Sequence, residues 1–393
     1  MKVTSVKTTL LRFPRYERPP TFSVNPTHIF PEFAPGGTGV SGGRAESPDL
    51  IVVEVETDEG LTGLANTNCA CLAVRTLIED YLGPILVGEE PTDTSRIWEK
   101  LSRLAIGLGR TGLVSIAISL LDIALWDIKG KAAGLPVYRL LGGAAQPRLR
   151  VYASRLYGPD TGLLREEAAS YVEQGFTAMK QRLAFGPAAG AEGMRKNREL
   201  VAAVRDTIGD EVELMVDCCR AFDAQYAVRM LRRLEEFDLV WVEEPVLPHD
   251  HEGYVHVRQR VSMPISGGEF EYDRHAFQRW AQMGCADIWQ PDANRAGGIT
   301  ECQRIFHLAS AKGIPVIPHG GQLHNYHLIA ASYNSPVAEY FPLQEQITDG
   351  NAFFWHVMKG EPVATEGYLE LPESPGLGLS LDPEAMARYT VDI

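Results

Sequence analysis

From about Gln146 onward, short apolar segments alternate with amphipathic helical segments, and this alternation restricts the possible folds most strongly. Eight strand-then-helix steps in roughly 200 residues are what a (β/α)8 TIM-type barrel needs, because each parallel strand requires a helical crossover. A doubly wound open sheet is the alternative, but no glycine-rich phosphate-binding fingerprint opens any of these helices. The predicted strands are Leu149–Ser154, Ala178–Leu183, Glu213–Asp217, Leu239–Glu243, Ile265–Gly268, Asp287–Gln290, Pro315–Pro318 and Ala338–Phe341.

The first part of the chain shows strands followed by helices, which predicts an α+β domain. Residues 1–17 and 50–66 read as strands, and residues 72–141 have helical spacing. The stretch 19–46, rich in Pro, Gly and Ser, is too long for a simple connector, so we expect a functional or mobile loop. The predicted divisions are an N-terminal α+β domain (1–143), a barrel (144–358) and a C-terminal segment (359–393) that packs back on the first domain.

The composition argues against several classes of protein. With 45% hydrophobic and 22% charged residues among 393, the chain can bury a large core. A formal net charge of −14 disfavours nucleic acid and anionic membranes as partners, and no apolar run reaches the roughly 20 residues that cross a bilayer. The six cysteines lack paired CxxC spacing, and the N-terminus lacks the apolar stretch of a signal peptide. We therefore expect a cytoplasmic location.

Three of the predicted strands end in a carboxylate: Asp217, Glu243 and Glu269 follow one another at equal steps of 26 residues. This step is about the length of one βα unit, so the three side chains are expected at the same height, at the C-terminal mouth of the barrel. Converging carboxylates repel one another unless a cation lies between them. Hard oxygen ligands with room for water and substrate predict a Mg²⁺ site.

An acid and a histidine follow the next two predicted strands. Asp292 lies in the motif QPDANRAGG, and His319 lies 27 residues later in IPHGG. An aspartate beside a histidine can fix its tautomer and raise its basicity. We therefore predict His319 as the general base and Asp292 as its partner.

Cations and one further acid complete the predicted site. Lys180 and Arg182 are separated by one residue near the end of the second strand, so both point to the same face. They are expected to contact the substrate, and Lys180 could also serve as a second base if its pKa were lowered. Glu339, on the eighth strand, is a candidate for a substrate oxygen. In the 19–46 loop, His28 and Arg44 are candidate substrate contacts.

The motifs taken in order resemble those of the enolase superfamily, mandelate racemase subgroup. They are SLLDIALWDIKGKAAGLPVYRLLGG before the barrel, then KQR, VDCC, WVEEP, SGGE, QPDANRAGGIT, IPHGG and AEYF on strands two to eight. The resemblance implies a capping α+β domain over a barrel, Mg²⁺ on the three carboxylates and the His319–Asp292 dyad. It also implies that Glu339 contacts the substrate carboxylate. Enolase-superfamily sites are known to pair a Lys or His base with Mg²⁺.

Within that subgroup the chain is similar to acid-sugar dehydratases, the rhamnonate dehydratases above all. The stretches LAFGPAAGAEGMRKNREL and HDHEGY carry this likeness. Two departures affect the substrate: Phe270 follows Glu269 where rhamnonate dehydratases have His, and Arg182 stands where they have Pro.

The predicted reaction is the dehydration of an aldonate or aldarate to a 2-keto-3-deoxy acid. His319, or alternatively Lys180, removes the C2 proton, the metal stabilises the enediolate, and the C3 hydroxyl leaves. A racemase, epimerase or cycloisomerase using the same enediolate is the alternative, and a non-catalytic metal- or sugar-binding protein is a third hypothesis. Arg182 in place of the second Lys of the mandelate racemase Lys-x-Lys pattern disfavours two-base racemisation. Enzymes of this type commonly assemble, so a homo-oligomer is expected.

Overall fold

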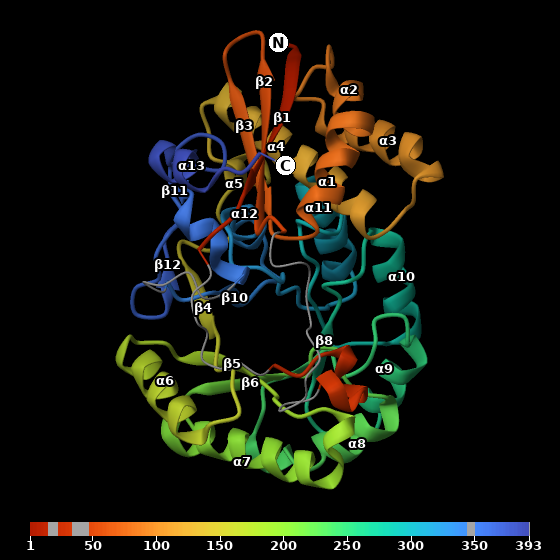
Figure 1. Cartoon of the computed structure of the whole chain (residues 1–393), viewed down its shortest axis with the longest axis vertical. Helices are drawn as coiled ribbons and strands as arrows, with labels where there is room; N and C mark the ends of the chain where they lie inside the picture. Colours follow the sequence, from red (N-terminus) through yellow and green to blue (C-terminus); the bar gives the residue numbers. More distant parts are fainter. Residues whose placement is uncertain (15–22, 34–46, 344–349, 393) are drawn as a thin grey trace.

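The computed structural model describes residues 1–14, 23–33, 47–343 and 350–392. The chain begins with an antiparallel meander in the order β1-β2-β3, which forms one end of the molecule (Figure 1). The tight turn between β2 and β3 includes Gly60, which adopts a left-handed φ of 78°. The strand bounds are β1 (Val3–Leu11), β2 (Leu50–Thr57) and β3 (Thr62–Thr67).

Helices pack against this sheet, and the central one is α4 (Leu113–Ala133). Gly63 of β3 allows a close approach to α4, because a Cβ there would lie 2.0 Å from the carbonyl oxygen of Ala124. The helix ends at Gly134, which has a left-handed φ of 67°. The other segments are α1 (Cys71–Thr76), the π-helical turn η3 (Leu77–Leu82), α2 (Gly83–Leu86), α3 (Thr94–Leu104), the 3₁₀ turn η4 (Ala105–Gly107) and α5 (Val137–Leu140).

The barrel strands form a curled parallel sheet in the order β10-β4-β5-β6-β7-β8-β9. Seven of the eight predicted segments contain one of these strands, so the predicted barrel class is confirmed. The strands are β4 (Leu149–Ser154), β5 (Ala178–Arg182), β6 (Glu213–Asp217), β7 (Val242–Glu243), β8 (Ile265–Gly267), β9 (Ile288–Trp289) and β10 (Ala338–Tyr340).

The structure differs from the ideal eightfold pattern in two places. The strand expected at Pro315–Pro318 is reduced to a single bridge between Val316 and Trp289. Its two prolines cannot donate ladder hydrogen bonds, which explains the short pairing. In the described part of the chain, β10 is followed by the 3₁₀ helix η7 (Gly350–His356) and not by an eighth α-helix.

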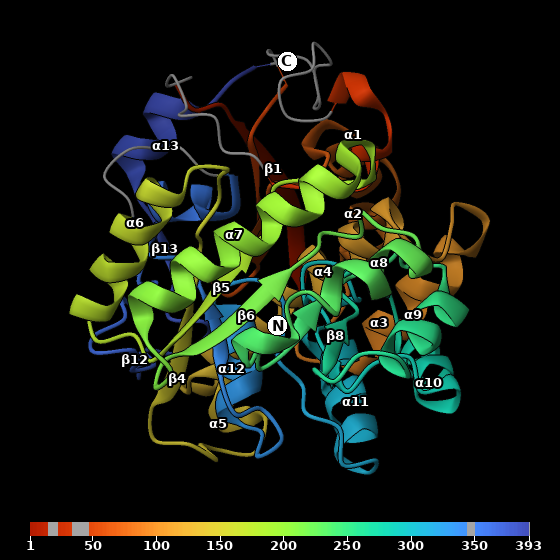
Figure 2. The ribbon, with the colours of Figure 1, turned by 90° about the horizontal axis from the view of Figure 1, so that it is seen from below.

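Helices cover the outside of the curled sheet, and α6 to α10 surround the strands in both views (Figures 1 and 2). The helices are α6 (Thr161–Glu173), α7 (Gly190–Ile208), α8 (Ala224–Leu231), α9 (His251–Arg258), α10 (Arg274–Met283), α11 (Gly298–Ser310) and α12 (Leu323–Ala330).

A layer of apolar side chains fills the barrel interior. The rings of Tyr152 and Trp241 meet edge to face at 5.5 Å, and Lys180 Nζ lies 5.5 Å from the Tyr152 ring centroid. The barrel is therefore a packed core at this level and not a pore. Other members of this layer are Ala178, Met215, Ile288, Ile317 and Val337.

The C-terminal segment contacts both the barrel and the first sheet. Thr390 bridges Leu11 of β1, and Arg12 N donates to Tyr389 O at 2.8 Å. The C-terminal helix lies beside the N-terminal sheet in Figure 1. The elements are β11 (Met358–Lys359), β12 (Tyr368–Leu369), which pairs with β4, β13 (Ser380–Leu381), which pairs with β11, and α13 (Pro383–Tyr389).

No helix in the described ranges is both long enough and apolar enough to span a membrane.

Candidate active site

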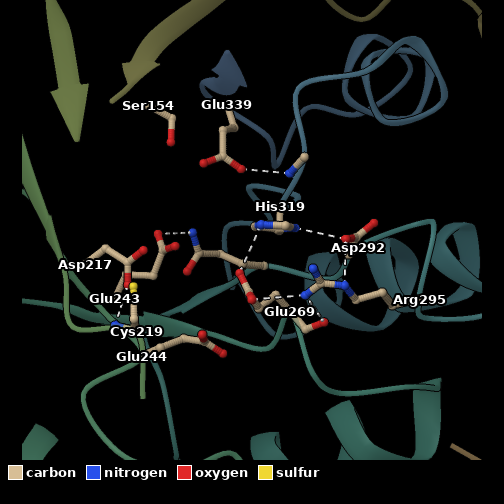
Figure 3. Close-up of polar contacts among 12 residues, drawn as sticks. Ser154, Asp217, Cys219, Glu243, Glu244, Glu269, Asp292, Arg295, His319 and Glu339 are labelled. Atoms are coloured by element: carbon tan, nitrogen blue, oxygen red, sulfur yellow. Dashed lines mark hydrogen bonds and ion pairs between the residues drawn. The ribbon is translucent and has the colours of Figure 1, made fainter. Parts of the chain in front are cut away.

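The three predicted metal ligands lie at the carboxyl ends of neighbouring parallel strands. Asp217 and Glu243 are register partners on β6 and β7. Glu269 follows β8 after Gly268, whose φ of 115° turns the chain at this point. Figure 3 shows the three acids on the same side of His319.

In this structure each of these carboxylates pairs with a cation of the chain itself. Arg182 Nε lies 3.1 Å from Asp217 Oδ2, and Lys180 Nζ lies 2.6 Å from Glu243 Oε1. Glu243 Oε2 accepts a 2.6 Å hydrogen bond from Gln290. These contacts compensate for the cost of burying negative charge.

Two arginines contact Glu269. Arg220 and Arg295 place Nη1 at 2.6 Å and 3.0 Å from the same oxygen, Oε1. Both guanidinium groups also face the ring of Phe270, at 4.1 Å and 4.5 Å from its centroid. Burial alone would raise the pKa of Glu269, but His319 and the surrounding arginines hold it well below the usual range.

Strained backbone is concentrated beside these acids. Cys219, Arg220 and Glu244 all have left-handed φ values, 46°, 62° and 43°, which cost energy for residues with a Cβ. Arg220 N donates to Glu244 O at 2.7 Å and its side chain pairs with Glu244 Oε2 at 2.5 Å, so the two strained turns stabilise each other. Burial raises the pKa of Glu244 well above its usual value.

His319 and Asp292 form the predicted pair. Nδ1 of His319 lies 2.9 Å from Asp292 Oδ2, and Nε2 lies 3.1 Å from Glu269 Oε2 (Figure 3). Asn325 fixes the loop by donating to the His319 carbonyl oxygen at 2.8 Å. Burial lowers the pKa of His319, but Glu269 and Asp292 raise it to about 9 in this arrangement. Asp292 thus holds Nδ1 of the imidazole, and Nε2 points toward Glu269.

Lys180 is buried between two carboxylates. Its side chain is 1% exposed and its Nζ lies 2.6 Å from Glu243 and 2.9 Å from Glu339. Burial opposes its charge, but Glu243 and Glu339 raise the pKa of Lys180 well above its usual value. Glu339 Oε2 also accepts from Gly320 N at 2.7 Å, which links β10 to the His319 loop.

Two candidate substrate contacts, His28 and Arg44, were predicted in the 19–46 loop, and the structure describes only His28. His28 lies in the 3₁₀ turn η1 (Pro26–Ile29), where its Nε2 pairs with Asn25 Nδ2 at 3.1 Å. The turn is attached to the end of β5, since Val24 N donates to Leu183 O at 2.8 Å. His28 Nδ1 is buried without a partner among the described residues. Arg44 lies outside the described residues.

Several residues of this cluster were not identified as candidates from the sequence. Arg220 and Arg295 each follow a strand-end acid by three residues, a signal that could have identified them. Ser154, at the end of β4, is fully buried beside Glu339 (Figure 3). Its position at the carboxyl end of a barrel strand was the available signal.

The donor chemistry of the site fits a hard divalent cation. Asp217, Glu243 and Glu269 supply oxygen ligands only, and Glu244 Oε1 is a further buried oxygen without a hydrogen-bond partner among the described residues. Within the described ranges, no three acidic, histidine or cysteine side chains converge with metal-binding geometry, and Lys180 and the arginines pair with these acids. A cation would take over part of the charge compensation that these basic side chains now provide.

A pocket opens beside His319 at the junction of the first sheet and the barrel. One wall is the end of β3 and the residues after it, Asn66 to Cys69, and the opposite wall includes Asp292 and His319. The barrel mouth is therefore closed in part by the N-terminal domain. The remaining lining residues are Leu50, Asn294, Arg295, Gly320, Gln322, Phe341 and Phe354.

Two family profiles match the chain in sequence order. The mandelate racemase / muconate lactonizing enzyme N-terminal domain matches residues 34–142, and the enolase C-terminal domain-like profile matches residues 163–385. The chain belongs to the mandelate racemase / muconate lactonizing enzyme group of the enolase superfamily. This confirms the family predicted from the strand-end motifs.

Relatives within the superfamily carry different activities. The L-rhamnonate dehydratase of Saccharopolyspora erythraea is 38% identical over 344 residues, which is 87% of this chain and 85% of the relative. The crystal structure of rhamnonate dehydratase from Gibberella zeae complexed with Mg has a TM-score of 0.84 at 28% identity, covering 99% of this chain and 96% of that one. The 3,6-anhydro-D-galactonate cycloisomerase of Zobellia galactanivorans has a TM-score of 0.83 at 30% identity, covering 100% of both chains.

Proposed function

We propose that the protein is a Mg²⁺-dependent sugar-acid dehydratase that converts an aldonate or aldarate into a 2-keto-3-deoxy acid. The observation that carries the proposal is the His319–Asp292 pair, which directs Nε2 toward the strand-end carboxylates. The relative with 38% identity is an L-rhamnonate dehydratase, which supports dehydration as the reaction class.

Asp217, Glu243 and Glu269 would hold the metal. Asp217 and Glu243 start from register partners on adjacent strands, and the related dehydratase of Gibberella zeae was solved with Mg. When bound, Mg²⁺ supplies Lewis-acid polarisation of the substrate carboxylate, which acidifies the C2 proton. Compensating the charge of Glu269 would also remove the main interaction that raises the pKa of His319.

His319 then moves the protons. Its Nε2 removes the proton from C2 while Asp292 holds Nδ1 and stabilises the imidazolium. The positive charges of Lys180 and Arg182 favour the enediolate that forms. His319 returns the proton to the C3 hydroxyl, the C3–O bond breaks, and water leaves. Tautomerisation of the remaining enol gives the 2-keto acid.

Lys180 serves as a fixed positive charge in this proposal and not as a second base. Two carboxylates raise its pKa, so it stays protonated near neutral pH. A two-base racemase needs a neutral base on the opposite face of the substrate, and this arrangement does not favour one. Cycloisomerisation through the same enediolate is the second candidate, because one structural relative at 30% identity is a cycloisomerase.

The test is a screen of mono- and diacid sugars with Mg²⁺, with chemical detection of 2-keto acids. We expect one or more substrates to lose water, and His319→Asn to abolish turnover. His307→Asn, a change at an exposed histidine of α11, is the matched control and should retain activity. A product of unchanged mass with deuterium at C2 would instead favour an isomerase, and full turnover by His319→Asn would refute the role of His319.

The metal assignment is tested separately from turnover. Calorimetric titration with Mg²⁺ should show binding to the wild-type protein and much weaker binding to Glu243→Gln. Equal affinity of the two proteins would contradict the assignment of Glu243 as a ligand.

A further inference from the structure

Three neutral amide side chains form a hydrogen-bonded row along the pocket beside His319. Gln322 Nε2 donates to Asn66 Oδ1 at 3.0 Å, and Asn294 Nδ2 donates to Gln322 Oε1 at 3.1 Å. Asn66 is the last residue but one of β3, Gln322 occupies the N-cap position of α12, and Asn294 follows Asp292 by two residues. The row therefore joins the N-terminal sheet to the two loops that carry the catalytic pair.

The last atom of this row has no hydrogen-bond partner in the part of the chain that the structure describes. Asn294 Oδ1 is buried without a hydrogen bond among the described residues, and Asn294 is only 8% exposed. Its position is fixed from the main chain, since Asn294 N donates to Asp292 Oδ1 at 2.8 Å. Burying an amide oxygen without a donor is unfavourable, so the pocket offers an acceptor to a hydroxyl group.

The electrical neutrality of the row indicates which ligand group it accepts. An amide can accept from and donate to a hydroxyl, and the whole row can reverse its polarity because each member has both kinds of atom. Arg295, which lines the same pocket, already pairs with Glu269 and Asp292. The row thus suits an uncharged hydroxyl better than a second carboxylate.

We propose that Asn294, supported by Gln322 and Asn66, is a specificity-determining subsite that binds a hydroxyl of the substrate beyond the reacting C2 and C3 atoms. This inference rests on the proposed function and narrows its substrate class. The preferred substrate is a sugar monoacid with a hydroxylated tail, and not an aldarate or a short 2-hydroxy acid.

The test combines a variant with a change in the substrate. Turnover by wild-type protein and Asn294→Ala is measured with a sugar monoacid and with deoxy analogues that each lack one distal hydroxyl. We expect Asn294→Ala to lower kcat/KM roughly ten- to hundredfold on the full substrate, mainly through KM. On the one deoxy analogue that lacks the bound hydroxyl, the variant and the wild type should be nearly equal.

Two further variants keep the result interpretable. Asn66→Ala, at the other end of the row, should lower kcat/KM on the full substrate by a smaller factor. Its kcat/KM on the analogue that lacks the bound hydroxyl should stay close to that of the wild type. Asn334→Ala removes an amide that donates to Phe306 O and Ile314 O away from the pocket, and it should leave the preference between substrates unchanged. An equal loss by Asn294→Ala on the full substrate and on every deoxy analogue would show a merely structural role and overturn the proposal.

Calorimetry separates this inference from the proposed reaction. If the wild type forms no 2-keto acid, binding of the same monoacids and deoxy analogues to Mg²⁺-loaded wild type and Asn294→Ala still measures the subsite. A selective loss of affinity would support the subsite although the reaction is wrong. Equal affinities, or no binding to the wild type, would refute the subsite.

Discussion

The indole Nε1 of Trp98 donates a 2.7 Å hydrogen bond to the carbonyl oxygen of Gly297, across the contact between α3 and the barrel. Gly297 belongs to the loop that carries Asp292 and Arg295, so the N-terminal domain holds part of this loop. Arg274 and Arg304 face the Trp98 ring at 5.4 Å and 4.7 Å and both pair with Glu301.

Replacing this indole tests the coupling between the two parts of the molecule. Trp98→Phe keeps a ring between the arginines but removes the donor to Gly297. We expect a loss of about 1 kcal/mol in the free energy of unfolding and a lower kcat, since the Asp292 loop loses one restraint. Chemical denaturation and steady-state kinetics measure the two effects. If the variant is less stable but its kcat is unchanged, the hydrogen bond contributes to stability and not to the rate.

The close approach of α4 to the same loop gives a second prediction. At Gly298 a Cβ would lie 2.4 Å from Asp122 Oδ2, and φ is +84°. Gly298→Ala should therefore destabilise the protein through both steric overlap and backbone strain. Gly88→Ala is the matched control, because Gly88 has nearly the same φ of +86° but open space around it. Thermal unfolding should show the larger loss for Gly298→Ala, and equal losses would mean that backbone strain alone matters.

The catalytic pair gives a prediction on rate. Asp292→Asn preserves the shape of the side chain but offers no negative charge to the imidazolium and can favour the wrong tautomer of His319. We expect kcat to fall about 10²- to 10⁴-fold while Mg²⁺ affinity changes little. Kinetics and calorimetric metal titration check both parts. A kcat within a few fold of the wild type would show that His319 does not depend on Asp292.

Glu361 should make stability depend on pH. It accepts a hydrogen bond from Leu323 N at 3.0 Å, and burial raises its pKa from the usual 4.5 to about 8. Between these values the folded state keeps a proton that the unfolded state releases, so this contribution to stability is present below pH 4.5 and is lost as the pH rises to 8. Glu361→Gln cannot titrate and should become progressively more stable relative to the wild type over this range.

Melting temperatures of both proteins from pH 5 to pH 9 measure this effect. Glu211→Gln, a change at an exposed carboxyl group, should show no such trend. A constant difference between Glu361→Gln and the wild type across the range would mean that Glu361 does not titrate as described.

Sequence patterns alone were enough to predict the barrel class, the family and the positions of the strand-end acids. These follow from local patterns, because strand periodicity and the repeat length of a βα unit place Asp217 and Glu243 in register without any knowledge of distant contacts. The catalytic assignments of these residues are still predictions. The extent of the predicted seventh strand was overestimated, since the two prolines around Val316 limit its pairing to a single bridge.

The contacts between side chains from separate elements are known only from the tertiary structure. Arg220 and Arg295 converge on Glu269 from two different loops, and Asn66 reaches Gln322 across 256 residues of sequence. Such contacts depend on how the first domain packs over the barrel mouth, and neither periodicity nor spacing encodes that packing. Local motifs therefore predict a metal site and a base, whereas the pocket beside His319 forms only where the two parts of the fold come together.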